Sequence, residues 1–88
     1  MVRQVVKSNK YYKSLKLIPK QDRDNIEREV DRLETDLTGV EKIRDTKNQA
    51  RLDVGDYRVF LLREKGKLIT ILHIEEAVRR TTTTYHKR

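Results

Sequence analysis

Hydrophobic residues follow two different spacings along this chain, and the change between them falls near Ala50. Before that point apolar residues recur every three or four positions, which is typical of one face of a helix. After it they alternate with polar residues, which is typical of strands with one buried face. Val2, Val5 and Val6 precede the helical part as a candidate first strand, because β-branched side chains favour an extended backbone.

Two helices are expected in the first half of the chain. Ser8 can cap the first one. Its apolar positions recur at helical spacing and are Tyr11, Leu15 and Ile18. Pro19 ends or kinks this helix and can open the next one, since the first turn of a helix does not need the missing amide proton.

The second helix carries a longer apolar stripe, formed by Ile26, Val30, Leu33 and Leu37. Charged residues fill its other side, as on a helix that packs one face against a core. We expect this helix to stop near Thr38 and Gly39, because glycine is the usual residue at a left-handed helix exit. A polar connection to the second half is expected to follow.

Three strands are expected in the second half, at residues 50–54, 57–62 and 68–74. Gly55 with Asp56 supplies the first turn and a segment containing Gly66 the second, so short connections make an antiparallel meander. The whole chain, 1–88, is expected to be a single α+β domain of order β-α-α-β-β-β. Its helical hairpin would pack on one face of a small, mainly antiparallel sheet and leave the other face free for a ligand.

Three side chains of the expected strands allow both a structural and a functional interpretation. Tyr57 and Phe60 could be a platform for stacked bases, but strand aromatics in a chain with 6% aromatic residues are more often buried. We therefore assign both to the core. His73 alternates with Ile74 and is interpreted as a partly buried structural histidine rather than a catalytic one.

The charge of the chain indicates a polyanionic partner. Charged residues make up 40% of the sequence, apolar residues 35%, and the formal net charge is +7. A core this small benefits from a binding partner, and a basic field attracts nucleic acid by neutralising its phosphates. Charge alone leaves open an acidic protein partner, or no specific partner at all.

Several kinds of site are excluded by the composition. The chain has no cysteine, which excludes disulfides and thiolate ligands and indicates an intracellular setting. His73 and His86 are the only histidines, and neither has a carboxylate at ligand spacing, so no metal and no other cofactor is expected. Ser8 and Ser14 are far from both histidines, which disfavours acyl transfer. No apolar run suits a signal peptide or membrane span, so we expect a soluble cytoplasmic protein with no membrane contact.

The residues left for chemistry are arginines with a tyrosine and a histidine near the end of the chain: Arg51, Arg58, Arg79, Arg80, Tyr85 and His86. Guanidinium groups bind phosphate and stabilise the charge of a pentacoordinate transition state, and Tyr or His can transfer protons or stack on a base. RNA supplies its own 2′-hydroxyl nucleophile. Each arginine alone is more often a solvated surface residue, so only their convergence in space would indicate a site.

The segment from Arg51 to Leu61, RLDVGDYRVFL, is similar to the central hairpin of the RelE/ParE toxin superfamily, where a basic strand meets a Gly-x-Tyr-Arg turn. The helical hairpin with its junction at residues 17–19, and Arg79 six residues before Tyr85, extend the resemblance over nearly the whole chain. It implies a RelE-like microbial RNase fold. For RelE-type members it also implies metal-independent cleavage of messenger RNA in the ribosomal decoding site, by 2′-hydroxyl attack that leaves a cyclic phosphate and a 5′-hydroxyl.

The resemblance implies a toxin of a type II toxin–antitoxin system that inhibits translation. Its partners would be messenger RNA, ribosomal RNA and a cognate antitoxin, which we expect to be an acidic chain that folds on the basic surface. The oligomeric state of the free chain is left open. Codon preference and the identity of the antitoxin are also left open.

Site residues can be carried over by position. Arg58 matches the strand arginine at the scissile phosphate, Arg79 the late basic residue that stabilises the transition state or leaving group, and Arg51 a basic strand position. Tyr85 matches a tyrosine that stacks on or orients the substrate and can take part in proton transfer. His86 has no firm counterpart, and the base is left open between His86 and the carboxylates of Glu75 and Glu76. The residues expected to bind RNA beside them are Lys47, Gln49, Arg80 and Lys87.

The sequence also departs from the RelE pattern. Gln49 stands where a second strand lysine is frequent, which removes a candidate general base. Glu75 and Glu76, expected after the last strand, would repel phosphate unless they point away or pair with Arg79 and Arg80. Two alternatives therefore stay open beside the ribonuclease: a ParE-like toxin that inhibits DNA gyrase, and a catalytically weakened homologue that only binds an antitoxin.

Overall fold

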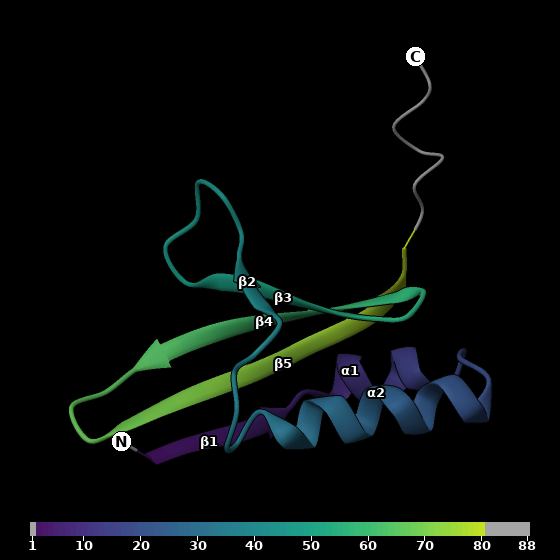
Figure 1. The fold of residues 1–88 in the computed structure, drawn as a ribbon, viewed down its shortest axis with the longest axis horizontal. Coiled ribbons are helices and arrows are strands. Elements are labelled where there is room, and N and C mark those ends of the chain that lie inside the picture. Colours follow the sequence, from purple (N-terminus) through teal and green to yellow (C-terminus); the bar gives the residue numbers. More distant parts are fainter. Residues whose placement is uncertain (1, 81–88) are drawn as a thin grey trace.

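The computed structural model describes residues 2–80 and contains two helices and a five-stranded sheet (Figure 1). The elements in chain order are β1 (Val2–Lys7), α1 (Asn9–Leu15), α2 (Lys20–Arg32), β2 (Val40–Lys42), β3 (Gln49–Val54), β4 (Tyr57–Lys65) and β5 (Ile69–Arg79). The predicted α+β class and helical hairpin are confirmed. Strand β2 was not predicted, and it lies within the expected polar connection. No helix in the described range is long and apolar enough to cross a membrane.

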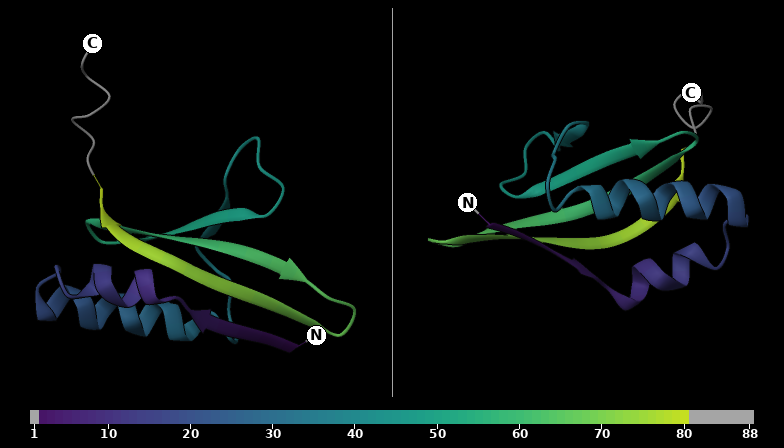
Figure 2. Two further views of the ribbon diagram at one scale, coloured as in Figure 1. Left: turned by 180° about the vertical axis from the view of Figure 1, so that it is seen from behind. Right: turned by 60° about the horizontal axis from the view of Figure 1, so that its bottom comes forward.

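The strands lie in the order β1-β5-β4-β3-β2. Strands β2 to β5 pair antiparallel, as the predicted meander requires, whereas β1 runs parallel to β5. The first strand of the chain therefore lies beside the last. Both helices lie on one side of the sheet, and the opposite face carries no helix in the described part of the chain (Figures 1 and 2).

The core lies between the two helices and the face of the sheet that they cover. It is built by Tyr11, Leu15, Ile18, Ile26, Val30 and Leu33 from the helical half and by Ala50, Leu52, Tyr57, Val59, Leu61, Leu72, Ile74 and Ala77 from the strands. Strand residues in this set alternate with residues of the open face, since successive side chains of a strand point to opposite faces. The apolar residues that recur at helical spacing in the first half and at every second position in the strands are therefore the buried residues.

Phe60 is not part of this core, and the prediction that it is buried with Tyr57 was wrong. Tyr57 is buried, but Phe60 is three positions along β4 and belongs to the other face. It lies opposite Arg51 on β3 and Glu76 on β5 and is only partly buried. An apolar ring thus lies among charged residues on the open face.

The last strand extends to Arg79, five residues beyond the expected end at Ile74, so Glu75 and Glu76 lie within β5 rather than after it. The pairing shifts between Ile74, opposite Leu61, and Glu76, opposite Phe60. Glu75 is the extra residue of a β-bulge, and a bulge changes the phase of the following side chains. Ala77 therefore continues the buried series of Thr70, Leu72 and Ile74.

Helix α1 explains why β5 continues past the end of β1. Its two serines bond to the strand edge that β1 leaves unpaired: the Ser8 hydroxyl donates to the carbonyl of Glu75 at 2.8 Å, and the Ser14 hydroxyl accepts from the amide of Ala77 at 3.0 Å. Backbone groups at a partly buried edge need such partners. Ser8 also caps α1, as predicted, by accepting from the amide of Tyr11 at 3.0 Å.

Helix α2 begins after Pro19, as predicted, but ends at Arg32 instead of near Thr38 and Gly39. Gly39, with φ of 92°, belongs to a turn in which the amide of Val40 donates to the carbonyl of Leu37 at 3.1 Å. Leu37 packs against the core from this irregular segment. Leu37 follows Leu33 at helical spacing because Leu33 is part of the core and Leu37 packs against it, although the backbone at Leu37 is not helical.

A polar cluster links β1, α1 and α2. The Tyr11 hydroxyl donates to Glu27 Oε1 at 3.2 Å, and Lys7 Nζ donates to Asp31 Oδ1 at 2.8 Å and to Glu27 Oε1 at 3.4 Å. Burial, with Glu27 beside it, raises the pKa of Tyr11. Burial disfavours the charge of Lys7, but Asp31 and Glu27 outweigh it and raise the pKa of Lys7. The tyrosine hydroxyl is thus satisfied within an otherwise apolar core.

The helix-packed core can be tested with a matched pair of leucine substitutions. Leu33 is fully buried and Leu17 is 88% exposed. Leu33→Ala should lower the free energy of unfolding in urea by about 3 kcal/mol, because it removes apolar contacts and leaves a cavity. Leu17→Ala should change it by less than about 0.5 kcal/mol. Equal effects of the two substitutions would contradict this packing.

Candidate functional site

The open face of the sheet carries two of the predicted catalytic arginines, Arg51 on β3 and Arg58 on β4. Arg51 lies opposite Phe60, and Arg58 lies opposite Asp53. Both arginines therefore belong to the face that the helices leave uncovered. The structure brings this part of the predicted set together.

Each of these arginines is engaged by a carboxylate. Arg58 Nε donates to Asp53 Oδ1 at 2.8 Å, and Arg51 Nη2 donates to Glu41 Oε1 at 3.0 Å. The hydrogen bond from Arg58 lowers the pKa of Asp53, and the charges of Arg58, Arg80 and Arg51 lower it further. Asp53 is thus an anion among three arginines. A phosphate group, which also accepts hydrogen bonds from guanidinium, can replace it there.

The two arginines at the end of β5 lie on different sides of the sheet. Arg79 pairs with Tyr57, whose side chain is on the helix-covered face. Arg80 follows beside the β3–β4 turn, where its amide donates to the carbonyl of Asp56 at 2.7 Å and its Nη1 to the carbonyl of Gly55 at 3.2 Å. The bulge at Glu75 determines which of the two arginines points to which face. The structure thus brings Arg80, rather than Arg79, to the Asp53 and Arg58 cluster.

The two glutamates of β5 do not form the ion pairs considered in the sequence analysis. Glu76 lies on the open face opposite Phe60, and its Oε2 is 3.5 Å from Lys10 Nζ of α1. Glu75 is exposed, and its carbonyl accepts from Ser8. Arg79 and Arg80 have no ion pair with either glutamate within residues 2–80.

His73 is partly buried on the open face, as predicted, and its Nε2 is 2.8 Å from Glu64 Oε1. Tyr85, His86 and Lys87 lie outside the described residues, so their roles stay predictions. Residues 2–80 contain no group of three potential metal ligands.

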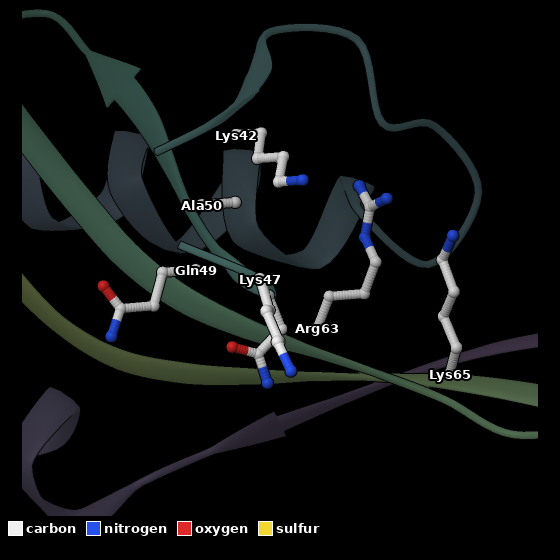
Figure 3. A pocket seen from close by; sticks show the side chains of 7 residues that line it. Lys42, Lys47, Gln49, Ala50, Arg63 and Lys65 are labelled. Carbon is white, nitrogen blue, oxygen red and sulfur yellow. The ribbon is translucent and has the colours of Figure 1, made fainter. Parts of the chain in front are cut away.

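A basic pocket of about 430 Å³ lies at the other end of the β3–β4 ladder (Figure 3). It is lined by Lys42, Lys47, Asn48, Gln49, Ala50, Arg63 and Lys65. Lys47 and Gln49 were predicted to bind RNA, whereas the other three basic residues were missed. The spacing of Arg63 and Lys65 could have indicated them, because residues two apart on a strand share a face.

Within residues 2–80 the cations of this pocket have no ion pair, in contrast to Arg51 and Arg58 of the open face. None of Lys42, Lys47, Arg63 and Lys65 forms an ion pair within the described part of the chain. Arg63 Nε is buried and has no hydrogen-bond partner there. The open face and the pocket are therefore two chemically different basic regions.

Similarity to known proteins is found at the level of structure. No protein-family model and no curated protein sequence matches this chain. A chain of the RelBE2 toxin–antitoxin complex from Mycobacterium tuberculosis superposes with a TM-score of 0.73 at 14% identity, covering 91% of this chain and 100% of that one. A chain of the archaeal RelE–RelB complex from Pyrococcus horikoshii OT3 gives 0.71 at 21% identity, covering 93% and 99%.

A chain of the RelB–RelE complex from Methanococcus jannaschii gives a TM-score of 0.65 at 19% identity and covers 94% of this chain and 99% of that one. The chain has a RelE-like fold. The expected resemblance is thereby confirmed for the architecture, from β1 through the helical hairpin to β5. In this RelE-like fold the open face with Arg51 and Arg58 and the basic pocket are the two candidate functional regions.

The ion pair between Asp53 and Arg58 predicts a dependence on pH. The pKa of Asp53 is lowered on folding, so its contribution to stability is complete above the ordinary aspartate value of about 4 and is lost as the pH falls through the lower, folded-state value. An NMR titration should give a carboxyl midpoint below the ordinary one. In Arg58→Gln the midpoint should rise, because the main cause of the shift is removed. An unchanged midpoint in that variant would show that the ion pair does not form.

Proposed function

We propose that this protein is the toxin of a type II toxin–antitoxin system, a metal-independent endoribonuclease that cleaves messenger RNA on the ribosome. The observation that carries the proposal is the placement of Arg51 and Arg58 on the uncovered sheet face of a RelE-like fold. Two guanidinium groups on one solvent-accessible face can bind a phosphodiester and neutralise the charge that develops on it.

In the proposed reaction the ribose 2′-oxygen attacks the adjacent phosphorus, and the bond from phosphorus to the 5′-oxygen breaks. The products are a 2′,3′-cyclic phosphate and a 5′-hydroxyl. Arg58 binds the scissile phosphate, and Arg51 binds the RNA backbone beside it. Tyr85 stacks on or orients the substrate, and Tyr85 or His86 transfers protons to and from the reacting oxygens.

Substrate binding requires a change of partner at Arg58. Asp53 accepts from its Nε in the free protein, so the phosphate competes with a carboxylate for the same guanidinium. Glu41 has the same relation to Arg51. An exposed ion pair contributes little, typically below about 1 kcal/mol, so a phosphate held in the decoding site can displace it. The carboxylates keep the arginines ordered until RNA arrives.

An antitoxin is the proposed protein partner. Three solved structures that share this fold are RelB–RelE type toxin–antitoxin complexes. A chain with net charge +7 fits an acidic partner that covers the arginines and excludes RNA. One observation also favours a second candidate function, antitoxin binding with weak or absent cleavage: Asp53 and Glu41 occupy the arginines, and Gln49 is neutral.

Cleavage can be tested by induced expression followed by primer-extension mapping of translated messages. The wild-type chain should produce new 5′ ends within coding regions, and Arg58→Ala should reduce them about a hundredfold, since a lost transition-state contact costs a few kcal/mol. Arg28→Ala, an exposed arginine of α2, removes the same charge and should leave cleavage unchanged.

The same experiment separates the alternatives. Intact messages together with a DNA-damage response would support a gyrase-inhibiting toxin in place of the ribonuclease. Intact messages, normal growth and tight antitoxin binding would support the catalytically weakened homologue.

The register of β5 predicts which late arginine assists cleavage. The resemblance gives this role to Arg79, but the bulge brings Arg80 beside Asp53 and turns Arg79 to the opposite side. We expect Arg80→Ala to lower the single-turnover rate on programmed ribosomes about tenfold or more, and Arg79→Ala less than about threefold. The reverse order would show that β5 changes register on the ribosome.

A further inference from the structure

We propose that the basic pocket is a second phosphate-binding site for the RNA backbone. It lies on the helix-side face of the sheet, opposite to the face that carries Arg51 and Arg58. The inference rests on the proposed function in one respect, that RNA is the polyanion. It gives a role to Lys42, Arg63 and Lys65, which have no role in the family resemblance and do not belong to the open face.

The three residues reach the pocket from two strands. Lys42 of β2 pairs with Ala50, Arg63 of β4 with Leu72, and Lys65 with Thr70, so strand alternation places all three on the helix-side face. Figure 3 shows the side chains of Lys42, Arg63 and Lys65 extending into the same space. The strand pairing thus gathers cations that are up to 23 positions apart in the sequence.

The positive charge of the pocket favours binding of an anion. Among the described residues that line the pocket there are four positive side chains and no carboxylate. Like charges at short range repel, and a buried guanidinium nitrogen without a partner, such as Arg63 Nε, costs free energy. A phosphate in the pocket relieves the repulsion, because its oxygens accept from an arginine and from lysines at once.

Two features favour RNA over an acidic peptide. Asn48 lines the same pocket, and its amide can both donate to and accept from ribose hydroxyls and base edges. Gln49 also lines a smaller cavity of about 130 Å³ that includes Phe60 of the open face. The two regions therefore meet at Gln49.

The distance between the regions fits a short stretch of RNA. Arg58 and Arg63 are five residues apart on β4, which is about 17 Å of strand. A single strand of a few nucleotides spans that length. We infer that the pocket holds backbone phosphates beyond the scissile one and so fixes the register of the strand over Arg58.

The test uses the full chain and a non-cleavable probe, a 2′-O-methyl RNA oligonucleotide of about ten nucleotides, with fluorescence anisotropy at several salt concentrations. The double variant Lys42→Ala/Lys65→Ala should bind about tenfold more weakly, and the slope of log K against log salt should fall by roughly 1.4, for two lost phosphate contacts. Both side chains are exposed, so the fold should be retained.

The matched control is Lys13→Ala/Lys16→Ala, which removes the same charge from exposed positions in and just after α1. It should change affinity less than about twofold. Arg63→Lys, which keeps the charge but loses the planar fork, should weaken binding about threefold with an unchanged unfolding midpoint.

Three outcomes would overturn the site: equal losses in the pocket and control variants, no loss in the pocket variant, or loss confined to a polyglutamate peptide used as a second probe. The last would assign the pocket to an acidic protein segment. Because the oligonucleotide assay needs neither ribosome nor cleavage, a chain that binds through the pocket but leaves messages intact would overturn the ribonuclease proposal alone.

Discussion

The parallel pairing of β1 with β5 is the constraint on which the rest of the structure depends. It places the start of the chain beside the last strand and requires the helical hairpin to return along one side of the sheet. Since β1 is shorter than β5, α1 takes the remaining edge, and Ser8 and Ser14 bond to backbone groups that no strand reaches. One pairing therefore determines which face is buried and which is open.

The open face and the pocket differ in how their cations are held. Arg51 and Arg58 are paired with carboxylates and so are ordered before a ligand binds. Arg63 has a buried nitrogen that no group among the described residues satisfies. The first arrangement suits exchange of one anion for another, and the second suits an anion that stays bound.

Much of this fold could be predicted because its core is periodic. Ile26, Val30 and Leu33 read as a helix face, and the alternation of Leu52 and Tyr57 with polar neighbours reads as strands. Strand β2 has three residues, too few to show a period. The face on which Phe60 lies and the bulge at Glu75 depend on the pairing between strands and on contacts with α1. A local sequence pattern does not contain these long-range contacts.

The same limit applies to the sites. The sequence places Arg51 and Arg58 on one face because they lie on a recognisable hairpin, whereas Lys42 and Arg63 come together only through the register of β2, β3 and β4. Strand β2 has one more consequence. A free sheet edge can recruit strands from other molecules, but this edge is three residues long and carries Glu41 and Lys42. At its β2 edge, a sheet with one uncovered face is thus protected against edge-to-edge aggregation.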